Sequence, residues 1–125
     1  MTALVLASQS ASRKAMLTEA GVPFTAQPAD VDERAIEADM AGAPPADIAR
    51  ALAKAKALAV ARGESEAWVL GSDSLVSVEG RRFDKPRSRD EAAQHLAFFS
   101  GKVMELHSAA ALARGDVVAW DHADV

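Results

Sequence analysis

The residues with the clearest chemical potential stand together near the N-terminus, in the segment Ser8-Gln9-Ser10-Ala11-Ser12-Arg13-Lys14. An apolar run at 4–7 precedes them, and a helix is expected to begin among them. Hydroxyls, the free backbone N–H groups of a helix N-terminus and two cations together attract anions, and phosphate suits this combination. Serines are also common helix caps, so these residues alone leave the phosphate site and the plain cap as equal alternatives.

Two acidic positions are candidates for holding a metal ion or activating water. Asp73 follows the apolar run 68–70, where open sheets place ligand-binding groups. A carboxylate there can bind Mg²⁺ or act as a base, and a turn-forming aspartate is the alternative. Asp32 and Glu33 form the second position on an expected loop, and by themselves they are interpreted as surface charge.

Three lysines could meet an anion. Lys54 and Lys56 are two residues apart on an expected helix, so their side chains point about 200° apart and cannot serve one site together. Lys56 falls nearer the apolar side of that helix, where it needs a partner such as a phosphate or a carboxylate, and Lys54 is expected at the solvent. Lys85 is expected on a loop after a hairpin, where alone it indicates only a surface turn.

Alternating strands and helices must position these residues. The expected strands lie at 3–7, 24–27, 68–70 with a continuation at 74–78, 103–113 and 117–120. The expected helices lie at 12–20, at 46–62, and from a capping box at 88–91 to 100. The acidic segment 30–34 is expected to be a loop, and 35–44 is left open between a short helix and a loop. This order predicts an α/β fold with a mixed, twisted sheet flanked by helices.

Composition limits the class of protein. The 125 residues correspond to about one domain, and half of them are hydrophobic, which is enough to build a core. A formal net charge of −4 argues against nucleic acid as a partner, and the absence of cysteine excludes disulfides and thiolate metal sites. The sequence contains no apolar run near the roughly 20 residues of a membrane span and no signal-peptide pattern. We therefore expect a single domain over 1–125, located in the cytoplasm and with no membrane partner.

Several short blocks, taken in order, resemble the Maf family of nucleoside-triphosphate pyrophosphatases. They are 6–13 (LASQSASR), 21–24 (GVPF), 32–33 (DE), 52–57 (LAKAKA), 70–73 (LGSD), 85–86 (KP) and 100–102 (SGK). The individual blocks are not specific, but their ordered combination is, and it extends from the first strand nearly to the last residue. The resemblance assigns the functional lysine to Lys56.

The resemblance implies an enzyme that hydrolyses a nucleoside triphosphate between the α and β phosphates, giving the monophosphate and pyrophosphate. It implies a divalent metal ion, Mg²⁺ or Mn²⁺, held by Asp73 and Glu33, with Asp73 as the catalytic base toward water. The residues that it implies for phosphate binding are Ser8, Ser10, Arg13, Lys56 and Lys85. It further implies the fold of inosine-triphosphate pyrophosphatases and a homodimer.

The sequence also departs from the family pattern. Ser12 and Ser74 occupy the two positions that help to choose the base in the family, and they match neither known branch, so the preferred base stays open. The family continues beyond Val125, so the chain is expected to lack the C-terminal third. Two alternatives to an active enzyme follow: a non-catalytic nucleotide-binding or regulatory module related to septum formation, and an inactive fragment.

Overall fold

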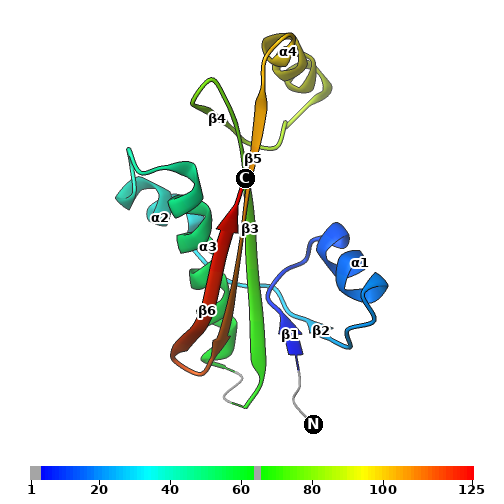
Figure 1. Ribbon diagram of the computed structural model, residues 1–125, viewed down its shortest axis with the longest axis vertical. Coiled ribbons are helices and arrows are strands. Elements are labelled where there is room, and N and C mark those ends of the chain that lie inside the picture. Colours follow the sequence, from blue (N-terminus) through cyan, green and yellow to red (C-terminus); the bar gives the residue numbers. More distant parts are fainter. Residues whose placement is uncertain (1–3, 64–65) are drawn as a thin grey trace.

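The computed structural model describes residues 4–63 and 66–125, so residue 3 of the first expected strand lies outside the described residues. The described chain forms a six-stranded mixed sheet of order β2-β1-β3-β5-β6, in which β4 pairs with β3 (Figure 1). The strands are β1 (Leu4–Leu6), β2 (Thr25–Ala26), β3 (Trp68–Val78), β4 (Arg81–Phe83), β5 (Met104–Arg114) and β6 (Val117–Asp124). The helices are α1 (Ala11–Glu19), α2 (Glu33–Asp39), α3 (Pro45–Ala61) and α4 (Arg89–Phe99).

The helices lie on both sides of the sheet, with α2 and α3 on one side and α1 on the other (Figure 1). β1 pairs in parallel with β2 and β3, whereas the β3–β4, β3–β5 and β5–β6 pairs are antiparallel. The predicted α/β class with a mixed sheet flanked by helices is therefore confirmed. Among the described helices, none combines the length and the apolar character needed to cross a membrane.

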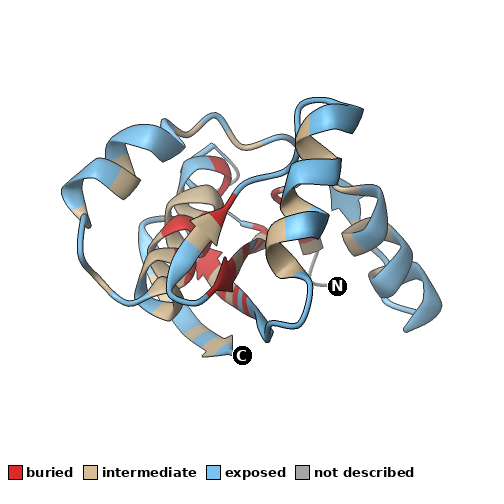
Figure 2. Cartoon of the chain, turned by 90° about the horizontal axis from the view of Figure 1, so that it is seen from above, coloured by how far each residue is buried: buried red, intermediate tan, exposed pale blue. Residues whose placement is uncertain are grey.

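The core lies between α3 and the sheet, and Figure 2 shows the buried residues concentrated there. On α3 the core is made by small or branched residues, which include Ala49, Leu52, Ala53 and Ala57. On the sheet, buried alanines of β5 belong to the same core. α1, α2 and α4 have no buried residue within their bounds. Small side chains on both surfaces let the helix approach the sheet closely. α3 is therefore a rigid support for the side chains it bears, Lys56 among them.

β3 is an eleven-residue strand that pairs with β5 along nearly its whole length. Its other edge is shared, because β1 pairs with 68–70 and β4 pairs with 76–78. The sequence predicted that the first part of this strand ends at Asp73, and this was wrong: the pairing with β5 carries the strand straight through. Asp73 therefore lies in mid-strand, level with the gap between β1 and β4.

α2 is the second departure from the sequence prediction. The side chain of Asp32 accepts a hydrogen bond from the backbone N–H of Ala35 at 3.2 Å, which caps a helix that begins at Glu33. The expectation of a loop was therefore wrong for Glu33 and Arg34. The open segment 35–44 divides into helix up to Asp39 and a turn before α3. β4 forms the second strand of the expected hairpin, for which no bounds were predicted, and the other helices and strands fall within a few residues of their predicted bounds.

Candidate active site

Asp73 and Lys56 face each other across the interface between β3 and α3. The Nζ of Lys56 donates to Oδ1 of Asp73 at 2.9 Å, and the two side chains are only 15% and 10% exposed. Gly71 makes this approach possible, because a Cβ there would lie 2.2 Å from the carbonyl oxygen of Ala53 on α3. A glycine two residues before Asp73 on the same face of the strand thus brings the helix close enough for Lys56 to reach the carboxylate.

Glu33 completes a second ion pair with the same lysine. The Nζ of Lys56 lies 3.1 Å from Oε1 of Glu33, so one ammonium group bridges two carboxylates. We call Glu33, Lys56 and Asp73 the lysine cluster. The prediction that Lys56 lies on the inner side of α3 and that Lys54 faces the solvent is confirmed. Lys54 is 40% exposed and pairs with Asp121 on β6.

Burial dominates the titration of Asp73. Desolvation raises the pKa of its carboxyl above the ordinary value of 3.8, and the nearby charge of Glu33 raises it further. The hydrogen bond and the charge of Lys56 lower the pKa, as does the more distant Arg13, but they do not cancel the burial. A carboxylate whose pKa is raised binds a proton more readily, which is the property required of a general base.

The lysine cluster fits a divalent cation in its donor chemistry. Oδ2 of Asp73 is buried and has no hydrogen-bond partner among the described residues, so one carboxylate oxygen keeps an unused acceptor. Within residues 4–63 and 66–125, no group of three or more His, Cys, Asp or Glu side chains could enclose a metal ion. Two carboxylates leave coordination positions for phosphate oxygens and water, which is how Mg²⁺ is commonly held.

The second group of predicted site residues lies in the serine loop, which comprises residues 8–13. Ser10 caps α1 by accepting from the backbone N–H of Arg13 at 3.3 Å, and its hydroxyl also lies 3.0 Å from that of Ser12. Ser8 accepts from the backbone N–H of Ser10 at 3.0 Å. The capping role considered from the sequence is thus present for Ser10, and the same bonds hold the hydroxyls in one turn of chain.

Arg13 connects the serine loop to β3. Its guanidinium lies 3.5 Å from the hydroxyl of Ser8 and 3.5 Å from the hydroxyl of Ser74. Ser74 follows Asp73 directly, and neighbouring residues of a strand point to opposite faces. Arg13 and Lys56 therefore approach the same stretch of β3 from its two sides, and the predicted residues surround one free strand edge.

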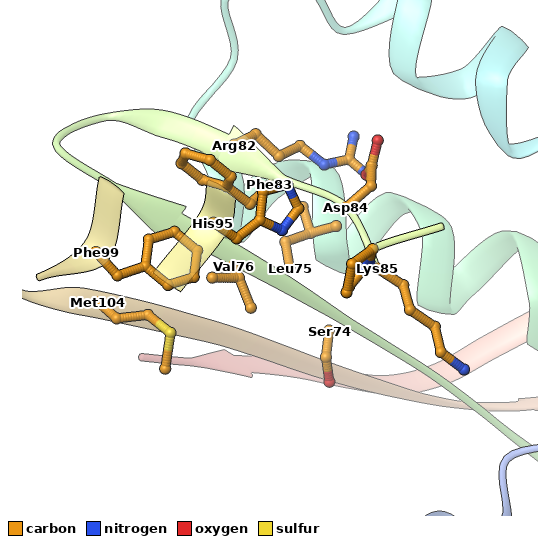
Figure 3. Close-up of a pocket in the computed structure, with 11 residues that line it drawn as sticks. Ser74, Leu75, Val76, Arg82, Phe83, Asp84, Lys85, His95, Phe99 and Met104 are labelled. Carbon is orange, nitrogen blue, oxygen red and sulfur yellow. The ribbon is translucent and has the colours of Figure 1, made fainter. Parts of the chain in front are cut away.

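Lys85 lines a pocket of about 330 Å³ together with Ser74, beside β4 and α4 (Figure 3). Ser74 and Lys85 lie at one end of the pocket, and Phe99 and Met104 lie at the other (Figure 3). Lys85 also lines a groove of about 450 Å³ with Glu33, which we call the α2 groove. Lys85 therefore borders both the pocket and the α2 groove, and among the described residues no ion pair joins it to the lysine cluster.

Sequence reasoning missed three residues at this site. His95 and Phe99 of α4 line the pocket, and Arg82 lines both the pocket and the α2 groove. The aromatic spacing in α4 was a usable signal, because His95 and Phe99 are four residues apart and share one face of the helix. Arg82 had no such signal, since its partner Glu37 lies on a segment whose structure the sequence left open.

Comparison with solved structures places the fold in a known class. The described chain is similar to a HAM1 protein from Coxiella burnetii, with a TM-score of 0.59 and 18% identity, over 98% of this chain and 68% of that chain. At this identity the likeness concerns the fold alone, and it agrees with a mixed sheet with helices on both sides.

The sequence itself defines the family. Residues 3–125 match the profile described as Maf-like protein, and the chain belongs to the Maf-like family. A 7-methyl-GTP pyrophosphatase of Rhizobium meliloti (strain 1021) is 50% identical over 121 residues, covering 95% of this chain and 61% of that protein. A nucleoside triphosphate pyrophosphatase of Rhodopseudomonas palustris (strain HaA2) is 46% identical over 114 residues, covering 91% of this chain and 56% of that protein. The chain therefore spans about three fifths of the length of these curated relatives.

Proposed function

We propose that this chain is a nucleoside triphosphate pyrophosphatase that hydrolyses the bond between the α and β phosphates, giving the monophosphate and pyrophosphate. The observation that carries the proposal is the pair of carboxylates, Asp73 and Glu33, bridged by Lys56 at 2.9 and 3.1 Å beside a free strand edge. Membership of the Maf-like family and the pyrophosphatase relatives support it.

Each group of the site then has a chemical task. Asp73 accepts the proton of the attacking water, and its raised pKa favours that transfer. Asp73 and Glu33 would hold the Mg²⁺ or Mn²⁺ ion, which neutralises charge on the phosphates when it is bound. Lys56 remains between the two carboxylates and adds a cation for the triphosphate.

The other phosphate ligands come from the opposite face of β3. The hydroxyls of Ser8 and Ser10 supply directional donors, and Arg13 supplies a planar fork that can bind two phosphate oxygens. Lys85 is a further phosphate ligand in this proposal, because it lines both the pocket and the α2 groove.

The proposed base site is the pocket that contains Ser74. Phe83, His95 and Phe99 give this pocket an aromatic side, and a purine ring can stack on such a surface. Ser12 lies in the serine loop and not in the pocket lining, so its effect on base choice would pass through Ser10 or Arg13. The relatives named for 7-methyl-GTP make that nucleotide the first candidate, because its positively charged ring favours an aromatic partner.

A nucleotide panel tests the proposal. The purified chain, and a version extended to the length of its relatives, would be incubated with UTP, dTTP, 5-methyl-UTP and 7-methyl-GTP and with Mg²⁺ or Mn²⁺. We expect release of pyrophosphate from at least one nucleotide, dependent on the metal. Folded chain that releases none from any nucleotide would contradict activity in this chain, and activity only in the longer version would place the missing groups outside residues 1–125.

A non-catalytic nucleotide-binding module is the second candidate. It rests on one observation: the lysine cluster and the serine loop offer contacts to both a metal ion and phosphates, and such contacts bind a nucleotide whether or not it is hydrolysed. Calorimetry with a triphosphate whose α–β bridge is a methylene group separates the two candidates. Binding without turnover of any natural nucleotide supports the module, and neither binding nor turnover contradicts both. The homodimer and the cytoplasmic location stay predictions, and light scattering tests the first.

A further inference from the structure

Arg82 links two segments that are far apart in the sequence. Its Nη2 lies 2.6 Å from Oε1 of Glu37 on α2 and 3.2 Å from Oδ1 of Asp84 on the loop that follows β4. Figure 3 shows the side chains of Arg82 and Asp84 directed toward each other. A single guanidinium nitrogen thus ties α2 to that loop.

Each of these segments also carries a residue of the proposed site. Glu33 lies one helical turn before Glu37, so both carboxylates belong to the same side of α2. Lys85 follows Asp84 directly. Glu33, Lys85 and Arg82 line the same α2 groove, so Arg82 shares that groove with a proposed metal ligand and a proposed phosphate ligand.

Few other contacts hold α2 in place. None of its residues is buried, and Ile36 packs only partly buried against the core. Among the described residues, the remaining ion pair of the helix is the one between Glu33 and Lys56, and the Glu33 side chain is 49% exposed. Glu37 is 25% exposed, so of the two paired carboxylates on α2 the one held by Arg82 is the better shielded.

Arg82 is suited to hold these two segments together. Its hydrogen bond with Glu37 is the main cause that raises the pKa of the guanidinium, so it stays charged at any working pH. Its Nη2 is already engaged by two carboxylates, which leaves this nitrogen with little capacity for a phosphate oxygen.

We propose that Arg82 is a positioning residue that sets the distance between Glu33 and Lys85 by tying α2 to the loop after β4. This inference rests on the proposed pyrophosphatase function for its effect on activity, but the tie itself is independent of that function. Removing the guanidinium would free α2, move Glu33 relative to Asp73 and weaken the metal-binding side of the site.

The test compares Arg82→Gln and Arg82→Lys with Arg62→Gln. Arg62 also pairs with one aspartate, Asp116 at 3.4 Å, but both side chains are largely exposed and outside the site, so this variant controls for the lost charge. The first readout is hydrogen exchange of the α2 amides without ligand. The second is the Mn²⁺ dependence of pyrophosphate release, with kcat and KM determined separately.

We expect Arg82→Gln to speed amide exchange in α2 while α3 remains protected. We also expect it to raise the half-saturating Mn²⁺ concentration by about tenfold, the lower end of the range for losing a residue that orients metal ligands, because Arg82 would act on Glu33 only through Glu37. Arg82→Lys should recover part of both effects, since it keeps a charge but not the planar fork. Combining Glu37→Gln with Arg82→Gln should add little to the single variant if Arg82 acts through Glu37.

Unchanged α2 exchange in Arg82→Gln, equal to that of Arg62→Gln, would overturn the inference. A wild-type chain that releases no pyrophosphate would instead contradict the proposed function, and the exchange measurement would still decide on Arg82. A general loss of protection in α3 for Arg82→Gln would show a folding role in place of a positioning role, and Arg82→Lys then serves as the folded variant.

Discussion

The two groups of polar residues beside β3 differ in how completely their charges are paired. In the lysine cluster, Lys56 contacts two carboxylates at 2.9 and 3.1 Å, and its side chain is only 15% exposed. In the serine loop, Arg13 reaches only two hydroxyls, both at 3.5 Å, and no carboxylate lies within ion-pair distance of it among the described residues. One group has its ionic partners already, and the other holds a cation without one.

This difference shows which kind of ligand suits each side. One lysine against two carboxylates leaves the lysine cluster with an excess of negative charge, which favours a cation. The serine loop presents a guanidinium and hydroxyl donors without an acid, which favours an anion. A metal-bound triphosphate carries both charges, so its metal and its phosphates would meet opposite sides of the same strand edge.

The largest expected effect comes from removing the acid of the lysine cluster. Asp73→Asn should lower kcat by about 10²- to 10⁴-fold, the range for loss of a general base, because an amide cannot accept the proton of water. Steady-state pyrophosphate release measures this change. Asp121→Asn is the matched control, since Asp121 pairs with Arg50 and Lys54 between α3 and β6, outside the site. We expect the control Asp121→Asn to keep the wild-type rate. If Asp73→Asn keeps that rate as well, Asp73 is not the base.

A smaller effect is expected on the other side of the strand. Arg13→Lys keeps the charge but loses the planar fork, so KM for the nucleotide should rise by about tenfold while kcat changes less. Its thermal midpoint should stay at the wild-type value, because contacts of 3.5 Å contribute little to stability. Lys14→Gln controls for charge next to the loop. A large fall in the thermal midpoint of Arg13→Lys would show that the serine loop is a structural element of the fold and not an open anion site.

Local patterns were enough to predict much of the frame of this site. The apolar spacing of the α3 residues correctly placed Lys56 inward and Lys54 outward. Ser88 caps α4 as its capping box indicated, with its hydroxyl accepting from the backbone N–H of Glu91 at 3.0 Å. These features depend on residues three or four apart, so the sequence contains all the information they need.

Long-range contacts account for what the sequence did not predict. Asp73 follows Gly71 and Ser72, which locally indicate a turn, yet pairing with Ala109 of β5 keeps it in a strand. The proposed roles of Glu33 and Lys85 came from the family resemblance, because neither position is distinctive by itself. Arg82 was missed because its proposed positioning role depends on an ion pair with Glu37, which is far away in the sequence and lies close only in the folded chain.

The smallest expected effect is a change in how stability depends on pH. It is expected for the lysine cluster and not for the serine loop. Because burial raises the pKa of Asp73 above 3.8, the folded chain binds more protons than the unfolded chain between 3.8 and the raised value. The contribution of Asp73 to the free energy of unfolding is therefore fully present below pH 3.8 and is lost as the pH rises through this window.

Urea unfolding of the wild type and of Asp73→Asn at several pH values from about 4 to 7 measures this, at the precision of the linear extrapolation. The difference in unfolding free energy, wild type minus Asp73→Asn, should fall with rising pH. Arg13→Lys should run parallel to the wild type, because the substitution keeps the positive charge of residue 13. A difference that rises with pH would mean that Lys56 outweighs burial at Asp73. The lysine cluster would then be a stabilising ion pair, and the argument for Asp73 as a base would lose its electrostatic support.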